Sequence, residues 1–294
     1  MKKYCIITNR NKDRDYSITD HILETLQREG MEAYTVGGRT DDTYIRPINI
    51  TQDLIEEGTD CIIVLGGDGT LIKIARNLAH LHIPFLGVNL GTLGFLASVE
   101  KDDVERAVRE MVEGTYTLEK RMMIKGRPTI NGRPRASVPA LNEIMISRAG
   151  FSRMVELKLY INDNLAEVYQ ADGILISTPT GSTAYNLSAG GPVVFPESRV
   201  MIIVPVCPHA LSSRAIVTSP FDKIRVEIGK RRSSAETEEA EVLVDGIKVA
   251  QLSSFDKVEI ERSRHYIELV RLSDYSFYDS MRKKIGHGEG QYEI

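Results

Sequence analysis

A buried strand that runs directly into a glycine-rich turn constrains the fold of this chain more than any other feature. Residues 61–65, Cys-Ile-Ile-Val-Leu, are apolar throughout, which is typical of a strand covered on both faces. The sequence Gly-Gly-Asp-Gly-Thr follows at 66–70, and residues 71–79 have spacing compatible with a helix. A strand, a glycine turn and a helix in this order bring backbone N–H groups and the positive end of a helix to a phosphate.

The acid in this turn needs its own explanation, because its charge would repel a phosphate. Asp68 makes sense there if it holds a cation or takes a proton from a hydroxyl group. It could instead only cap the helix that follows. A single glycine cluster does not decide between these interpretations, so the decision depends on the rest of the chain.

The composition is that of a chain that buries a core. It has 294 residues, of which 42% are apolar and 27% charged, and is long enough for two domains. The net charge of -4 argues against general nucleic-acid binding, and no apolar stretch approaches the roughly 20 residues that span a bilayer. The N-terminus shows no signal-peptide pattern, and the three cysteines lack C-x-x-C spacing. We expect a cytoplasmic protein with no membrane or nucleic-acid partner.

The first half of the chain alternates expected strands with expected helices. The strands cover residues 4–8, 32–36, 61–65 and 83–88, and the helices cover residues 17–29, 53–57, 71–79 and 102–113. This alternation predicts a Rossmann-like α/β domain, in which a parallel sheet carries helices on both sides. Ligands of such sheets bind beyond the carboxyl ends of the strands, where the glycine loops at 66–70 and 89–96 are expected. The ordinary dinucleotide fingerprint, G-x-G-x-x-G, is absent from the sequence.

The second half changes character near residue 117, where helical spacing gives way to many short strands. These strands are expected at residues 117–125, 127–130, 138–147, 155–161, 173–177, 200–206, 223–228, 241–245, 247–252, 257–262 and 265–271. Asn131-Gly132 and Asp245-Gly246 are hairpin signals between them. The pattern indicates a β-rich second domain at 116–271, after an α/β domain at 1–115. The charged stretch 229–241 and the glycine-containing tail are expected to be solvated.

Asn142 and Glu143 are expected to close a strand just before residues 144–148. A carboxamide beside a carboxylate suits a ribose, because the acid accepts from both hydroxyl groups and the amide also reads a base edge. A polar strand end without a ligand is the alternative. The pair alone does not decide between the two.

An acid, a buried strand and a loop dense in hydroxyl groups and glycines follow one another at residues 172–192. Small residues and hydroxyl groups line tight sites for sugars, phosphates and bases, and Tyr185 offers a flat face for stacking. A turn that only satisfies its own backbone is the alternative. Further along, Cys207 and His209 are too few ligands to predict a metal site.

Taken together, these blocks resemble the NAD kinase family, in its bacterial members, from end to end of the chain. The resemblance rests on Gly-Gly-Asp-Gly-Thr at 66–70, Asn142-Glu143, the loop at 172–192 with its Thr-Gly-Ser-Thr-Ala-Tyr sequence, and residues 208–214. Lipid kinases of the diacylglycerol type and phosphofructokinases have a motif related to the first block. The resemblance implies transfer of the γ-phosphoryl group of ATP, or in some members of polyphosphate, to the 2′-hydroxyl of the adenosine ribose of NAD.

The resemblance also implies roles for individual residues. Asp68 would be the general base, and the phosphate and ATP loop would comprise Gly66, Gly67, Gly69 and Thr70. The NAD site would comprise Asp68, Gly69, Lys73, Asn142, Glu143, Arg153, Gln170, Asp172, Thr180, Thr183, Ala184, Tyr185, Asn186, Leu187, Ser188 and Cys207. Because the sequence places few fixed cations near Asp68, we expect Mg²⁺ or a similar ion to neutralise phosphate charge.

Two positions of the sequence depart from the pattern of the NAD kinase family. Gln170, two residues before Asp172, and Ala215, after Arg214, depart from the pattern common in the family, which puts individual contacts in question.

The resemblance implies that residues 272–294 pack back on the first domain. The β-rich domain with its many strand edges predicts a homo-oligomer, a dimer or a tetramer. The alternatives are a related kinase acting on a lipid or sugar, and a non-catalytic NAD or NADP sensor.

Overall fold

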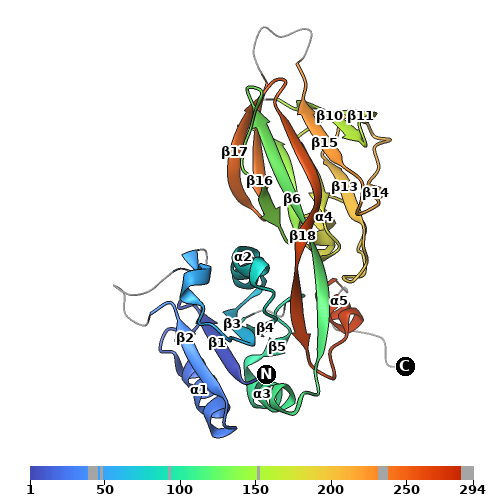
Figure 1. The fold of residues 1–294 in the computed structure, drawn as a ribbon. Helices are drawn as coiled ribbons and strands as arrows, with labels where there is room; N and C mark the ends of the chain where they lie inside the picture. Colours follow the sequence, from blue (N-terminus) through green and yellow to red (C-terminus); the bar gives the residue numbers. More distant parts are fainter. Residues whose placement is uncertain (39–45, 47–48, 92–93, 151–152, 231–237, 286–294) are drawn as a thin grey trace, which may run out of the picture. The chain divides into compact units, whose positions relative to one another are not determined.

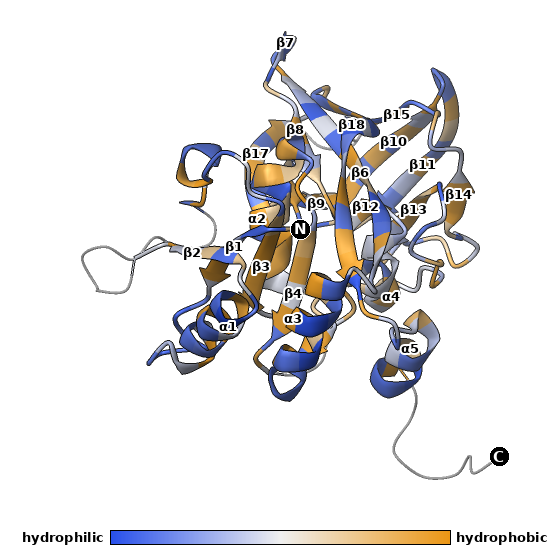
Figure 2. Cartoon of the chain, turned by 60° about the horizontal axis from the view of Figure 1, so that its bottom comes forward, coloured by the Kyte–Doolittle hydropathy of each residue, from blue (hydrophilic) through white to orange (hydrophobic). Residues whose placement is uncertain are grey.

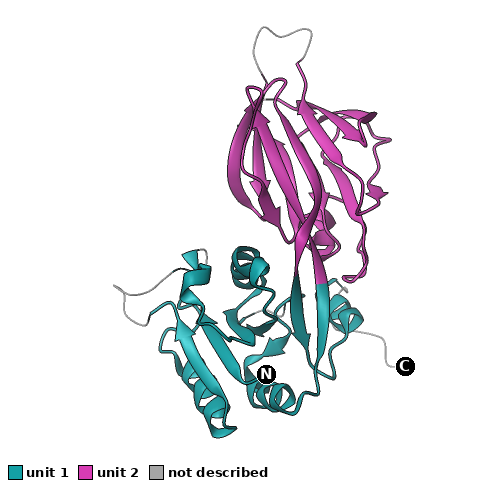
Figure 3. Ribbon diagram, in the orientation of Figure 1, with its two compact units in different colours: residues 1–120, 267–294 teal, residues 121–266 magenta. Residues whose placement is uncertain are grey.

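The computed structural model describes residues 1–38, 46, 49–91, 94–150, 153–230 and 238–285. The chain divides into two units, one of residues 1–120 and 267–294 and the other of residues 121–266 (Figure 3). Two long strands, β6 (Thr117–Ile130) and β18 (Lys257–Arg271), belong to both units (Figure 1). The division therefore falls inside these strands, a few residues from the limits at 115 and 271 that were expected from the sequence. Among the described residues, no helix combines the length and the apolar character needed to cross a membrane.

A parallel sheet forms the centre of the first unit. Its strands lie in the order β2-β1-β3-β4, with β5 and the end of β18 also paired to β4, and each of these pairs is parallel. The bounds are β1 (Lys3–Thr8), β2 (Glu32–Val36), β3 (Cys61–Gly66), β4 (Phe85–Asn89) and β5 (Val99–Glu100). The predicted α/β class of this domain is confirmed.

Helices cover both faces of this sheet. The helices are α1 (Ser17–Arg28), α2 (Asp68–Leu78), α3 (Val104–Glu113) and α5 (Phe277–Ile285). Ile22 of α1 and Met111 of α3 pack in one buried cluster with Leu86 of β4. On the other face, a Cβ atom on Gly87 would lie 2.7 Å from Leu71 of α2, so the glycine admits this helix. Figure 2 shows the matching pattern, with apolar β3 and β4 and polar outer faces on α1 and α3.

Short 3-10 helices also belong to this unit, at Gln52–Leu54, Ala79–Leu81 and Lys101–Asp103. The first replaces the helix that the sequence predicted at 53–57, because Ile55 already has an extended backbone. The aromatic rings of Phe277 in α5 and Phe95 are 6.0 Å apart, so α5 packs within the first unit.

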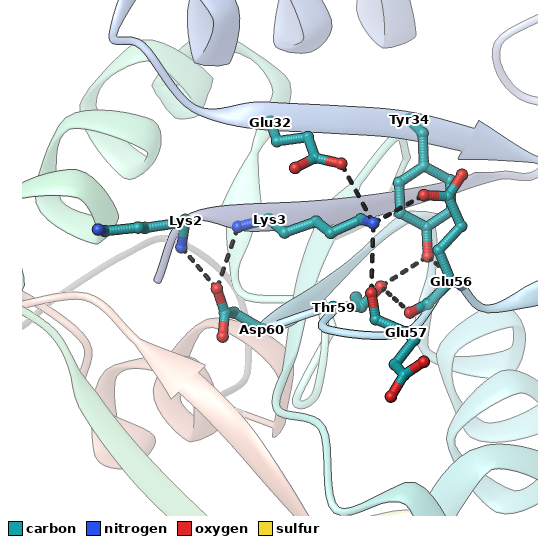
Figure 4. A network of polar contacts seen from close by, with 8 residues as sticks. All are labelled: Lys2, Lys3, Glu32, Tyr34, Glu56, Glu57, Thr59 and Asp60. Atoms are coloured by element: carbon teal, nitrogen blue, oxygen red, sulfur yellow. Dashed lines mark hydrogen bonds and ion pairs between the residues drawn. The ribbon is translucent and has the colours of Figure 1, made fainter.

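A polar network ties together the amino ends of the parallel strands (Figure 4). The Asp60 carboxylate accepts the backbone N–H groups of Lys2 and Lys3 at 2.7 and 3.1 Å, and the Lys2 bond lowers the pKa of Asp60. The Lys3 ammonium pairs with Glu32 at 3.1 Å and Glu56 at 2.8 Å. This network lies at the end of the sheet opposite to the glycine loops, so we assign it to the fold and not to the site.

The second unit consists of two sheets packed around one core. One sheet has the order β14-β13-β12-β9-β16-β17, and the other contains β11-β10-β15-β18 with β6, β7 and β8 attached. Their inward residues, such as Ile146 of β9, Leu157 of β10 and Val242 of β16, form a single buried cluster. The predicted β-rich character of this domain is confirmed.

The strands of this unit have the following bounds, with two short helical turns among them. They are β7 (Arg133–Pro134), β8 (Val138–Ala140), β9 (Glu143–Arg148), β10 (Val155–Ile161), β11 (Asn164–Ala171), β12 (Gly173–Ser177), β13 (Met201–Val206), β14 (Ile216–Thr218), β15 (Ile224–Ile228), β16 (Glu239–Val244) and β17 (Ile247–Ser253). The turns are a 3-10 helix at Thr180–Thr183 and α4 (Tyr185–Ser188). Both predicted hairpins form, β6–β7 and β16–β17. Much of the expected charged loop, and the tail after residue 285, lie outside the described residues.

Candidate active site

The glycine turn connects β3 to α2 more tightly than the sequence predicted. Gly66 ends β3, Gly67 precedes the helix with an extended backbone, and α2 already begins at Asp68. A Cβ atom on Gly66 would lie 2.7 Å from the Thr70 hydroxyl oxygen, so this glycine lets the strand meet the first helical turn. Asp68, Gly69 and Thr70 therefore lie at the positive end of α2, where a negative charge is stabilised.

The loop after β1 lies beside this turn. Asn9 donates a hydrogen bond to the Thr70 hydroxyl at 2.9 Å, and the Lys12 ammonium lies 3.5 Å from the carbonyl oxygen of Gly66. The strand order reverses between β1 and β3, which is where open α/β sheets bind their ligands. Lys12 is a cation at the glycine turn that the sequence argument missed, because nothing in the spacing of residues 9–12 points to residue 66. Lys73 is exposed on α2.

The Asp68 carboxylate contacts the second glycine loop. Its Oδ2 accepts the backbone N–H of Phe95 at 2.8 Å, and its Oδ1 accepts those of Leu96 at 3.1 Å and Ala97 at 3.0 Å. Gly67 is the N-cap residue of α2, and among the described residues no side chain makes a cap bond there. The alternative in which Asp68 serves only as a helix cap is therefore wrong, and the side chain instead joins the two glycine loops.

In the second unit, Asn142 and Glu143 open a strand and do not close one. β9 begins at Glu143, because Asp245 holds the backbone just before it. The Asp245 carboxylate accepts the N–H groups of Leu141, Asn142 and Glu143 at 3.0, 2.8 and 3.2 Å. Asp245 has a left-handed backbone, φ 45°, in the β16–β17 turn. The sequence identified this residue only as a turn residue, because its contact with Asn142 spans 103 positions.

The Asn142-Glu143 pair combines burial with acceptors that lack protein partners. Within the described residues, the Asn142 Oδ1 and Glu143 Oε2 atoms are buried and accept no hydrogen bond. Burial raises the pKa of Glu143 to about 8, and the nearby Asp245 carboxylate acts in the same direction. A neutral Glu143 carries an O–H donor, so near pH 7 the pair presents both donors and acceptors.

The hydroxyl-rich loop packs directly against this pair. Thr178 donates from its backbone to the Asn142 carbonyl at 2.8 Å and from its hydroxyl to the Leu141 carbonyl at 2.6 Å. A Cβ atom on Gly181 would overlap the Asn142 carbonyl oxygen, so only glycine fits. Thr180 accepts a hydrogen bond from buried Arg121 at 3.3 Å. The structure thus brings together two motifs that the sequence separates.

The remaining predicted residues of the loop differ in exposure. Tyr185 exposes 43% of its surface, whereas Asn186 is fully buried and donates to the carbonyls of Ser182 and Pro192. The amide group of Asn186 is thus used within the loop itself. Thr183, Ala184 and Leu187 are half-buried, and Ser188 is exposed.

The other predicted residues lie around this loop within the second unit. Asp172 pairs with Arg148 at 2.7 Å, and Gln170 donates to Glu156 at 3.0 Å. Cys207 is exposed, with a left-handed φ of 47° directly after β13, and Arg153 is also exposed.

Comparison with protein-family models gives two matches in chain order. Residues 5–116 match the ATP-NAD kinase N-terminal domain, and residues 141–272 match the ATP-NAD kinase C-terminal domain. The NAD kinase of Lachnoclostridium phytofermentans is 41% identical over 97% of this chain and 99% of its own length. That of Ruminiclostridium cellulolyticum is 39% identical over 97% of this chain and 98% of its own.

Solved structures show the same fold. Yeast NADH kinase, complexed with NADH, superposes with a TM-score of 0.78 at 22% identity, covering 100% of this chain and 90% of its own. The NAD kinase of Archaeoglobus fulgidus, in complex with ATP, gives 0.73 at 24% identity and covers 97% of both chains. The chain therefore belongs to the ATP-NAD kinase family, and its enzymatic function is that of an NAD kinase.

Proposed function

We propose that Asp68 is the general base of the NAD kinase reaction. It would take the proton of the 2′-hydroxyl on the adenosine ribose of NAD, while that oxygen bonds to the γ-phosphorus of ATP and the bond to ADP breaks, giving NADP. The observation that supports this most is the held carboxylate at the start of α2. Among the residues that the structure describes, its Oδ2 accepts one N–H, that of Phe95, so it retains acceptor capacity for a hydroxyl group.

The phosphates of the nucleotide are proposed to bind at the glycine turn. Gly66, Gly67, Gly69 and Thr70 surround the start of α2, whose N–H groups favour anions. Among the described residues outside its own helical turn, nothing lies within 4 Å of a Cβ built on Gly69, so the backbone is open to a ligand there. Lys12 would add positive charge beside Gly66. Phosphoryl transfer depends chiefly on such positioning and charge neutralisation.

A divalent cation such as Mg²⁺ is proposed to enter with the triphosphate of ATP. Within the described residues, no group of three or more His, Cys, Asp or Glu side chains could hold a metal ion. Both oxygens of Asp68 also already accept N–H bonds. These residues do not form a complete metal site, which agrees with the usual binding of Mg²⁺ through substrate phosphates, water and at most one or two carboxylates.

The nucleoside parts of NAD are proposed to bind at the Asn142-Glu143 pair and the adjoining loop. The buried acceptors of this pair would be satisfied by ribose hydroxyl groups or a base amino group. Tyr185, which opens α4 in the adjoining loop and is exposed, would stack on a flat ring. Lys73, Arg153, Gln170, Asp172, Thr180, Thr183, Ala184, Asn186, Leu187, Ser188 and Cys207 are proposed to complete the NAD site.

We propose that the chain forms a homo-oligomer through its β-rich unit. β11 is an edge strand of its sheet, and Leu165 and Val168 on it expose 55% and 41% of their surfaces. Exposed apolar residues on an open edge favour association with another strand. Light scattering at micromolar concentration tests this, and a fully active monomer would contradict it.

We also propose a cytoplasmic location. Cys5 and Cys61 are buried free thiols in neighbouring strands, β1 and β3, with no disulfide to each other. Burial raises the pKa of both thiols to about 12, which keeps them protonated and unreactive, as expected of structural cysteines in a reducing compartment.

The direct test of the activity is incubation of the purified protein with NAD, ATP and Mg²⁺, followed by an assay of NADP. We expect NADP to accumulate with turnover, at a rate that depends on the Mg²⁺ concentration. Tight binding of NAD without NADP formation would indicate a sensor. Phosphate transfer to a lipid or a sugar, with none to NAD, would indicate a related kinase.

A further inference from the structure

Arg271 is a buried cation at the end of β18 whose donors point at the second glycine loop. It exposes 2% of its surface. Its Nη2 donates to the carbonyl oxygen of Phe95 at 3.0 Å, and its Nη1 donates to that of Leu96 at 3.0 Å. These contacts join positions that are 176 and 175 residues apart in the sequence.

Other contacts fix the guanidinium group in this position. Nε pairs with the Glu119 carboxylate at 2.9 Å, and Nη1 also donates to the Ser98 hydroxyl at 2.9 Å. The Tyr275 ring lies against the guanidinium, 3.9 Å from the ring centroid to Cζ. Because the planar group is held at its edge and its face, it has one orientation.

The carbonyls that Arg271 holds belong to the same peptide groups whose N–H bonds hold Asp68. The carbonyl of Phe95 and the N–H of Leu96 form one peptide group, and the carbonyl of Leu96 and the N–H of Ala97 form the next. Each group accepts from Arg271 at its oxygen and donates to Asp68 Oδ1 at its nitrogen. Two peptide groups thus lie between a buried cation and a carboxylate.

We propose that Arg271 is a positioning residue that fixes the Asp68 carboxylate through these two peptide groups. A cation at the oxygen of a peptide group polarises its N–H, and hydrogen bonds in such a chain strengthen one another. Arg271 also keeps the loop from rotating its N–H groups away from Asp68. This inference rests on the proposed role of Asp68 as the base.

A double-mutant cycle on kcat distinguishes this role from a merely structural one. In Arg271→Lys the charge remains, but one ammonium cannot hold both carbonyls, Ser98 and Glu119 together. We expect kcat to fall on the order of 10-fold, with KM for NAD and ATP within about twofold of the parent. In an Asp68→Asn background, the same change should lower kcat no further, because the group it positions is gone.

The matched control is Arg106→Lys in the same unit. Arg106 pairs with Asp274 at 2.7 Å and with Asp103 and Glu110 at 3.6 Å, so the change weakens ion pairs without involving residues 95–97. We expect its kcat to stay at the parent value. If Arg271→Lys does not fold, Ser98→Ala removes one contact of Nη1, and a loss of about twofold that vanishes in the Asp68→Asn background is expected.

The outcomes separate this inference from the proposed base. Suppose that Asp68→Asn lowers kcat by orders of magnitude, and that the Arg271 or Ser98 change lowers kcat by the same factor in the Asp68→Asn background as in the parent. The positioning role is then overturned, while the role of Asp68 as the base remains. If Asp68→Asn itself stays near the parent rate, both ideas fail. A rise in KM with unchanged kcat in Arg271→Lys would also overturn the positioning role.

Discussion

The Asp68 carboxylate occupies the space where a side chain on residue 94 would lie, and residue 94 is a glycine. A Cβ atom at residue 94 would overlap Oδ1 of Asp68. Gly94 directly precedes Phe95, Leu96 and Ala97, whose N–H groups hold this carboxylate. The missing side chain at 94 is therefore what lets Asp68 reach its three donors.

Gly94→Ala should lower kcat while leaving the affinity for substrates nearly unchanged. The new methyl group displaces the carboxylate, and misplacing a catalytic group by a small distance costs on the order of 10-fold or more in rate. Steady-state kinetics of NADP formation measure both parameters. A folded variant with the parent kcat would show that the position of Asp68 does not matter.

Gly69→Ala, in contrast to Gly94→Ala, should stabilise the protein and affect KM, not kcat. A Cβ there would meet no described residue beyond its own helical turn within 4 Å, and residue 69 lies in the first turn of α2. Replacing a helical glycine by alanine should raise the free energy of unfolding by about 0.5–1 kcal/mol. If a substrate approaches the backbone there, KM rises even though the protein is more stable. Thermal unfolding and kinetics on one preparation check this, and an unchanged KM for both substrates would remove Gly69 from the site.

Glu143→Gln should change how stability depends on pH. The carboxyl pKa is about 8 in the folded chain and 4.5 ordinarily, so between these values the unfolded chain ionises while the folded chain stays protonated. Raising the pH through this window therefore lowers the free energy of unfolding of the parent, by about 1 kcal/mol per pH unit. The glutamine variant has no carboxyl group at 143, so its free energy of unfolding does not fall for this reason. Denaturant titrations at several pH values should show the variant gaining on the parent as the pH rises, and a constant difference would contradict the raised pKa.

Tyr185→Ala should weaken NAD binding more than it slows the reaction at saturation. A stacking face acts alike in the ground state and the transition state, so its loss appears in KM. Stacking on a base is worth about 1–3 kcal/mol, which corresponds to a rise in KM of roughly 5- to 150-fold. Tyr185→Phe keeps the face and serves as the control. A lower kcat at unchanged KM would assign Tyr185 another role.

The two domains could be predicted because local patterns determine them. Two-residue turns such as Asn131-Gly132 and Asp245-Gly246 adopt the positive φ angles that such hairpins need. One predicted strand boundary was wrong because a glycine can either end a strand or make room for a neighbouring side chain. Gly126 suggested a break between two strands, but β6 continues through it, and the glycine only avoids Ile144, which a Cβ would approach to 2.9 Å. β11 was missed because residues 164–168 are all exposed and show no alternation.

The motifs of the site could also be predicted, but not the residues that hold them. Asp68 and Glu143 lie in short, recognisable patterns. Asp245 accepts backbone N–H groups of the Asn142-Glu143 pair, and Arg271 donates to backbone carbonyls of the loop that contacts Asp68, in both cases more than 100 positions away in sequence. A backbone N–H or carbonyl is the same for every residue type, so no sequence pattern records which side chain it contacts.

The rate of NADP formation by Asp68→Asn at saturating NAD and ATP shows whether Asp68 is the general base. An Asn side chain would turn its NH₂ group toward at least one of the N–H donors at 95–97, so some loss of stability, about 1–3 kcal/mol, is expected. Unfolding and NAD-binding measurements confirm that the variant is folded and occupied. We predict that kcat then falls on the order of 10²–10⁴-fold, because the amide cannot take the hydroxyl proton. A folded variant that binds NAD and forms NADP within a few-fold of the parent rate would show that Asp68 is not the general base.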